Sequence, residues 1–205
     1  MPPKTSVATR RIVAGLFAVS LVCSFGVWRY IVVPVLGGDL SGHETHAGLL
    51  YAHAASGTLM LFFGAAALYV GWTRRFFSLH KWLGGTYLVA GSVVSVLALT
   101  LPLFERHEPA SIAVATDVVA SVWLAFSVMA WRAARNRRFD AHRGWMIRSY
   151  VVTWTFVFCR MAMQMPLFPS LGAEGITATI WVSFIIPVVA CEIVMQWPTT
   201  ARLSG

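Results

Sequence analysis

Charged residues are scarce in this sequence of 205 residues, and their scarcity excludes a soluble globular protein. Only 12% of the residues are Asp, Glu, Lys or Arg, whereas 58% are hydrophobic. The mean hydropathy of +0.69 leaves too few polar groups to cover a water-exposed surface. Lipid must therefore be the solvent for most of the chain.

Cysteines and common catalytic motifs are also scarce. The three cysteines, Cys23, Cys159 and Cys191, stand far apart in apolar segments, so no C-x-x-C pair suggests a thiolate metal site or a redox pair. The sequence contains no nucleotide-binding glycine loop, no H-E-x-x-H pair and no serine hydrolase set. Hydrolase and NTPase functions are therefore disfavoured, and membrane electron transfer is the enzyme-like activity left open.

Six long apolar segments account for most of the chain. Each has 21 to 26 residues, and a helix needs about 20 to cross the hydrocarbon core of a bilayer. The segments are Ile12–Leu36, Ala47–Trp72, Trp82–Phe104, Ile112–Arg132, Trp145–Phe168 and Ile176–Trp197. We therefore predict an all-α integral membrane protein with six transmembrane helices, in which residues 1–205 form a single membrane domain.

The positive charges predict the orientation of these helices. The formal net charge of +8 would suit a nucleic-acid partner, but the basic residues gather in alternate loops. With both termini in the cytoplasm, all lysines and arginines lie at the cytoplasmic side except Arg29, Arg106 and Arg160. This distribution follows the positive-inside rule. It predicts a multi-pass protein of the bacterial inner membrane, with the lipid bilayer as its partner and no nucleic acid.

Two helical hairpins in the middle of the chain repeat one pattern. Residues 74–82 read RRFFSLHKW, and residues 137–145 read RRFDAHRGW. Each segment follows a span that ends near a tryptophan, and its histidine is expected to open the returning helix. The repeat predicts a central four-helix bundle in which His80 and His142 hold equivalent positions near the cytoplasmic edge.

His80 and His142 are the candidate ligands of a cofactor. A bis-histidine haem needs two imidazoles at equal depth on facing helices, and these histidines meet that requirement. Tyr87, Trp145 and Met146 would supply apolar walls for a porphyrin. One b-type haem, or a quinone, is therefore the expected cofactor. The alternative is that both histidines cap helix starts beside lipid head groups, with the aromatic residues forming an interfacial belt.

Three ionisable residues form a second candidate site, an outer polar cluster. His53, Asp117 and Arg160 fall at similar depth on the second, fourth and fifth spans. Buried charges in lipid are costly unless they are paired, so we expect Asp117 to compensate Arg160, with His53 close by. Alternatively, Arg160 lies about 27 Å beyond His142 along its helix and extends to water at the outer boundary.

Other polar residues suggest weaker sites. His43 and His46, in the loop before the second span, could join His53 in a metal site, because His46 and His53 have a same-face helical spacing. Solvated loop histidines are the alternative. Glu192, deep in the last span, could accept a hydrogen bond or a proton from the region of the two hairpin histidines.

The motifs of the hairpins resemble a known family. They are His53-x-x-x-Gly57, then His80-Lys81-x-x-Gly84-x-x-Tyr87, then His142-Arg143-x-Trp145-Met146-x-Arg148-Ser149-Tyr150 followed by Arg160. Residues 47–160, the two hairpins, resemble the bacterial membrane family described as domain of unknown function 2306. The resemblance implies a bundle of membrane helices with no established activity.

A looser likeness, to membrane cytochromes of the b561 type, rests on histidines in a repeated helical hairpin. Those proteins use two histidine pairs at different depths. Here Thr116 and Asp117 stand where a second pair would need a histidine, so the chain departs from that pattern. At most one haem could be held by paired histidines.

Two functions follow from the sequence. The first is a redox module that moves electrons near the cytoplasmic leaflet, with a quinone or another membrane protein as partner. The second is a haem-free membrane scaffold, assembly factor or small-molecule transporter, in which the same histidines anchor helix starts.

Overall fold

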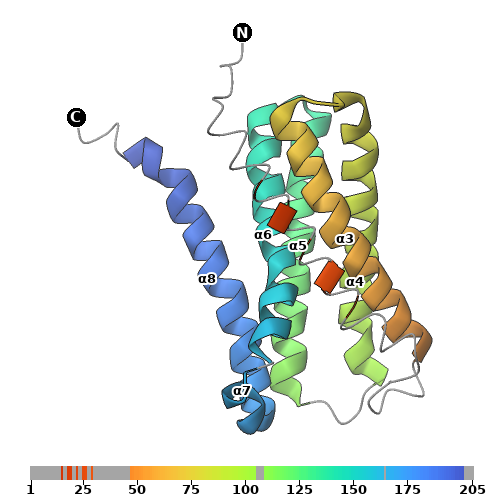
Figure 1. The fold of residues 1–205 in the computed structure, drawn as a ribbon, viewed down its shortest axis with the longest axis vertical. Helices are drawn as coiled ribbons and strands as arrows, with labels where there is room; N and C mark the ends of the chain where they lie inside the picture. Colours follow the sequence, from red (N-terminus) through yellow and green to blue (C-terminus); the bar gives the residue numbers. More distant parts are fainter. Residues whose placement is uncertain are drawn as a thin grey trace. The chain divides into compact units, whose positions relative to one another are not determined.

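The structure is a computed structural model that describes residues 47–104, 109–163 and 165–200, with scattered positions between 15 and 29. Its elements, labelled as in Figure 1, are α3 (Ala47–Thr73), the 3-10 turn η3 (Phe77–Leu79), α4 (His80–Phe104), α5 (Ala110–Arg135), α6 (Phe139–Ala162), α7 (Leu167–Ser170) and α8 (Gly172–Thr200). No strand occurs in these ranges. The predicted all-α class is therefore confirmed.

Four helical segments are long and apolar enough to cross a membrane. They are Tyr51–Thr73, Phe77–Thr100, Ala110–Arg135 and Gly172–Gln196, and they match the second, third, fourth and sixth predicted spans within a few residues. Large apolar side chains lie exposed along them, as expected where lipid is the solvent. The chain is thus a multi-pass membrane protein. The first predicted span, Ile12–Leu36, lies outside the described residues apart from isolated positions.

The fifth predicted span, Trp145–Phe168, has other bounds in the structure. Helix α6 begins earlier, at Phe139, and ends at Ala162. Proline lacks an N–H group and disfavours helix at the residue before it, so Pro166 separates α6 from α7. Helix α6 is long enough to span a bilayer, but it carries four charged residues and is not among the four apolar segments.

The chain divides into two compact units, residues 1–97 and 98–205, with the boundary inside α4. The first unit contains the hairpin of α3 and α4, and the second contains α5, α6, α7 and α8. The four-helix bundle of the two hairpins and the cytoplasmic placement of both termini stay predictions.

Small residues line the contact between α3 and α4 in the first unit. Ala65 and Ala67 are buried, and a Cβ placed at Gly57 would lie 3.9 Å from Cγ2 of Val94. Small side chains allow membrane helices to approach closely and pack by van der Waals contact. The missing side chain at Gly57 therefore allows α3 and α4 to lie close together at this point.

In the second unit, α6 and α8 pack together and both contact α5. Its core combines the large side chain of Trp123 with small polar residues such as Ser149 and Thr179, all almost fully buried. The Thr153 and Thr179 hydroxyls donate to carbonyls one turn earlier in their own helices, at 3.1 and 2.7 Å. These hydroxyls are thus satisfied without water.

Candidate functional site

The first helix of each hairpin ends in the same backbone conformation. Arg74 and Arg137, the matching arginines of the sequence repeat, are left-handed with φ of 58° and 56°. The N–H of Arg74 donates to the Val70 carbonyl, and the N–H of Arg138 donates to the Ala133 carbonyl, each at 2.9 Å. These are hydrogen bonds of the αL and Schellman types that close helix C-termini. Both turns therefore reverse the chain at equivalent residues.

His80 is the first residue of α4, as predicted, and its ring is held inside its own hairpin. Its Nδ1 lies 3.1 Å from the carbonyl oxygen of Ala67 on α3. The ring stacks on Phe77, with 5.3 Å between centroids and 8° between planes. A Cβ at Gly71 would lie only 2.9 Å from Cε1 of this ring. The absence of a side chain at Gly71 therefore leaves space for the imidazole.

His142 makes the same hydrogen bond in the second hairpin. Its Nδ1 lies 2.9 Å from the carbonyl oxygen of Ala130 on α5, 12 residues earlier, and the His80 partner lies 13 residues earlier. The repeat predicted that His142 would be the first residue of α6, and this prediction is wrong. His142 lies one turn inside the helix, because α6 begins at Phe139 and the His142 N–H already donates to the Arg138 carbonyl.

These two contacts determine which ring nitrogen carries the proton. A backbone carbonyl can only accept a hydrogen bond, so Nδ1 of each histidine must be the donor. In a neutral imidazole, Nε2 then holds the lone pair. Histidines that bind metals are commonly oriented in this way, with the second nitrogen donating to a carbonyl. We call this arrangement the histidine latch of each hairpin.

The residues predicted to wall a cofactor are packed within their own units. Tyr87 of α4 is fully buried, and Met146 of α6 is buried. The centroids of the Trp145 ring and the Phe126 ring of α5 are 5.5 Å apart. The Arg148 guanidinium lies 4.9 Å from the centroid of the Trp145 ring. Trp145 therefore links α6 to α5. A role for these side chains beside a cofactor stays a prediction.

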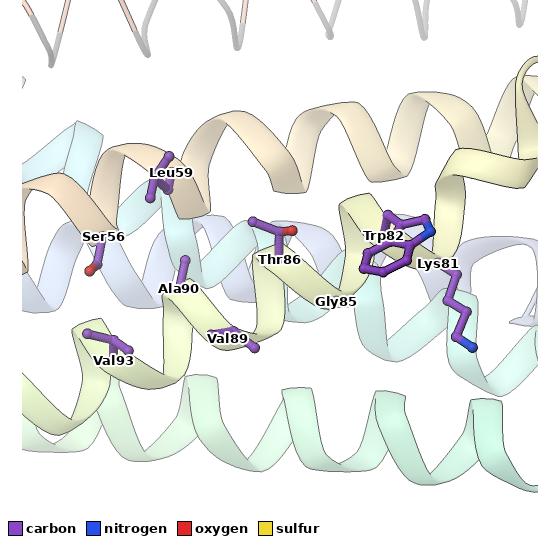
Figure 2. A pocket seen from close by; sticks show the side chains of 9 residues that line it. All are labelled: Ser56, Leu59, Lys81, Trp82, Gly85, Thr86, Val89, Ala90 and Val93. Carbon is purple, nitrogen blue, oxygen red and sulfur yellow. The ribbon is translucent and has the colours of Figure 1, made fainter.

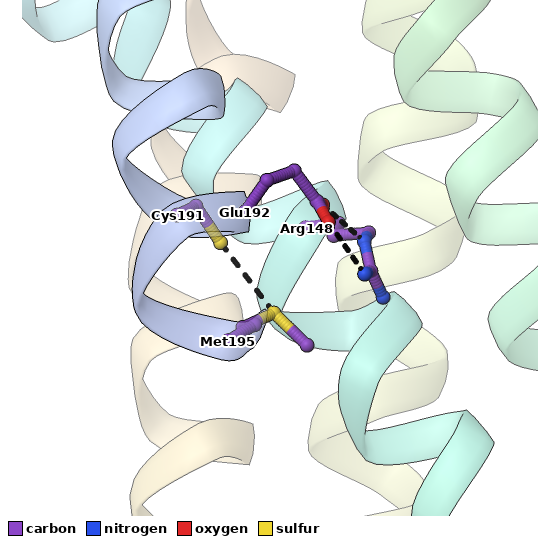
Figure 3. A network of polar contacts seen from close by, with 4 residues as sticks. All are labelled: Arg148, Cys191, Glu192 and Met195. Atoms are coloured by element: carbon purple, nitrogen blue, oxygen red, sulfur yellow. Dashed lines mark hydrogen bonds and ion pairs between the residues drawn. The ribbon is translucent and has the colours of Figure 1, made fainter. Parts of the chain in front are cut away.

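A bidentate ion pair joins α6 to α8. Nε of Arg148 lies 2.5 Å from Oε1 of Glu192, and Nη2 lies 2.8 Å from Oε2 (Figure 3). The Arg148 side chain is 17% exposed and that of Glu192 is 38% exposed. A Cβ at Gly144 would lie 3.2 Å from Nη1 of Arg148, so the glycine leaves space for the guanidinium. Paired charges in an apolar segment are functional candidates by default.

The predicted pairing of Arg160 with Asp117 is not formed. Arg160 is exposed in the last turn of α6, with its guanidinium 5.7 Å from the centroid of the Phe156 ring. Among the described residues, Oδ1 of Asp117 is buried and has no hydrogen-bond partner. Arg160 instead has the alternative geometry given above, in which its long side chain extends outward. His53 belongs to the other unit, and its place in an outer cluster stays a prediction.

Comparison with known proteins decides the family. The family described as predicted membrane protein, domain of unknown function 2306, matches residues 50–197. The chain belongs to this family. No curated protein and no solved structure matches the chain, and the looser likeness to b561-type cytochromes is not shown. The match reaches beyond the hairpins into α8, so both partners of the Arg148–Glu192 pair lie within it.

Arg148 is the functional candidate in this family member that sequence reasoning missed. Glu192 was expected to interact with the region of the hairpin histidines, but its partner is Arg148. A signal was available, because an acid inside an apolar span needs a cation at its own depth. Arg148 lies inside the last hairpin motif and satisfies that condition.

The predicted metal site of His43, His46 and His53 is only partly covered by the structure. His43 and His46 lie outside the described residues, and His53 lies half-buried on α3. In the part of the chain that is described, no group of three or more His, Cys, Asp or Glu residues is placed to hold a metal ion.

Proposed function

We propose that this protein is an electron-transfer module of the bacterial inner membrane in which His80 and His142 are the ligands of one b-type haem. The histidine latch is the observation that supports this function. In each hairpin Nδ1 faces a carbonyl oxygen, at 3.1 Å for His80 and 2.9 Å for His142, an orientation that is common among histidines that bind metals.

The repeat strengthens the proposal because the latch occurs at matched positions of two hairpins. A bis-histidine ligand set requires two axial imidazoles, and each hairpin supplies one with its Nδ1 directed at a backbone carbonyl. When bound, the haem would accept and release one electron at a time. The task of the chain is then to hold each imidazole in a single orientation and to surround it with apolar side chains.

Absorption spectroscopy tests the proposal. Protein purified in detergent from cells supplied with haem should absorb strongly in the Soret region. His80→Gln and His142→Gln should each abolish that absorption, because one axial ligand is lost. His53→Gln is the matched control, since it removes a histidine of the same membrane domain that lies outside the repeat, and it should keep the spectrum.

Two results would contradict the haem assignment. One is a colourless wild-type protein from haem-supplied cells, and the other is a coloured protein whose spectrum survives both hairpin substitutions. Extraction into organic solvent would show whether a colourless protein carries a quinone, which would keep the redox function and replace the cofactor.

A haem-free membrane scaffold, assembly factor or transporter is the second candidate. It is favoured by the fact that each histidine already has a partner within its hairpin, while the Arg148–Glu192 pair ties α6 to α8. In that case the histidines act as helix anchors. Their substitution would lower the thermal stability of a protein that never carries a chromophore.

A further inference from the structure

A groove of about 640 Å³ lies on the first unit, between α3 and α4. It runs along the α4 face from Lys81 and Trp82 at one end to Val93 at the other, with Gly85 and Val89 between (Figure 2). The side chains of Trp82 and Val89 are 77% and 67% exposed, so the groove opens at the surface of the helices.

The lining of the groove is amphipathic. Among the lining residues that the structure describes, Lys81 alone is charged, and it lies at the end nearest the basic turn of Arg74 and Arg75. The opposite half is mostly apolar, with Leu59, Val89, Ala90 and Val93, and its polar side chain is that of Ser56. A ligand with a negative group at one end and a hydrocarbon chain at the other would match this lining.

The length of the groove matches one leaflet of a bilayer. From position 81 to position 93 a helix rises by about 18 Å, and half of a hydrocarbon core is about 15 Å. The positive-inside rule places Lys81 at the cytoplasmic interface, where anionic lipids attract basic residues. Charge, length and depth therefore agree on one class of ligand.

We propose that this groove binds one anionic phospholipid, with its phosphate at Lys81 and an acyl chain along α4 toward Val93. Gly85 provides the depth of the groove, because a Cβ at this position would meet no atom within 4 Å. A side chain there would occupy the space of the acyl chain without disturbing the helices. This site is independent of the haem assignment.

Neighbouring glycines offer a matched pair of variants. Gly85→Leu fills the groove, whereas Gly84→Leu adds the same side chain at a position that also has open space but does not line it. Both changes alter the same helix by the same residue type. Thermal unfolding of both variants at the wild-type temperature would show that neither is misfolded.

Native mass spectrometry of detergent-purified protein mixed with phosphatidylglycerol or phosphatidylcholine measures the binding. The wild-type protein should retain one phosphatidylglycerol in preference to phosphatidylcholine. Gly85→Leu should lower its occupancy about tenfold, and Gly84→Leu should leave it unchanged. Lys81→Gln should remove a preference of about fivefold, the effect expected for one basic residue at a membrane surface. Equal retention of both lipids by the wild type, or equal occupancy in the two leucine variants, would overturn the proposal.

Discussion

Replacing Glu192 by glutamine should lower the free energy of unfolding by about 2 kcal/mol. The substitution leaves the Arg148 guanidinium, which is only 17% exposed, without its bidentate partner. Breaking a fully buried ion pair costs about 3 to 5 kcal/mol, and the partial exposure of Glu192 reduces that figure. Unfolding in mixed micelles of increasing sodium dodecyl sulfate content measures the loss.

Glu174→Gln is the control for this prediction, because Glu174 is an exposed acid in the first turn of the same helix. It should change the unfolding free energy by no more than about 0.5 kcal/mol. The double variant Arg148→Glu with Glu192→Arg should recover much of the stability lost in the single variants, since neighbouring charges are coupled. A loss for Glu192→Gln no larger than that of Glu174→Gln would contradict the structural role of the pair.

The same substitution at two glycines of α3 should have opposite effects on stability. At Gly71 an added Cβ would lie 2.9 Å from Cε1 of His80, whereas at Gly57 it would lie 3.9 Å from Cγ2 of Val94. Gly57→Ala should stabilise the protein by up to about 1 kcal/mol through helix propensity. Gly71→Ala should destabilise it by about 1 to 3 kcal/mol, because the His80 ring is held by Ala67 and Phe77 and must move.

Removing the imidazole tests the cause of that effect. In a His80→Ala background, Gly71→Ala should become neutral or stabilising, because the atom that it meets is gone. Unfolding measurements on the four proteins of this cycle give the coupling directly. If Gly71→Ala stabilises the wild-type protein as much as Gly57→Ala does, the ring does not occupy the place described.

The positions of the helices were predictable because, in a chain of this composition, long apolar runs form membrane-spanning helices. The bounds of α3, α4, α5 and α8 agree with the predicted spans within a few residues. The exception is α6, which ends at Ala162, whereas the predicted apolar span continued through Pro166 to Phe168. Hydropathy alone does not locate the end of that helix.

The contacts of the candidate sites were less predictable. Sequence spacing gives the depth of a residue in the membrane, but not the direction in which its side chain leaves the helix. Depth alone suggested that Arg160 would meet Asp117, yet Arg160 lies exposed over Phe156. The rotation of α6 against α8 instead brings Arg148 to Glu192.

The hairpin histidines show both sides of this limit. Their equivalence followed from the repeated motif, and the structure gives them the same kind of partner. The partner itself is a carbonyl 13 residues earlier for His80 and 12 residues earlier for His142. It follows only from the way in which the two helices of each hairpin pack. That contact is what assigns the tautomer of His80 and His142.

Nitrogen-15 NMR of the detergent-solubilised protein, labelled at its histidine rings, tests the histidine latch most directly. His80→Gln and His142→Gln spectra assign the two rings. In the neutral form each ring should show a protonated Nδ1 and a Nε2 without a proton, because a carbonyl oxygen can only accept the hydrogen bond. A proton on Nε2 with a bare Nδ1 in either ring would contradict the latch and, with it, the ligand role assigned to these histidines.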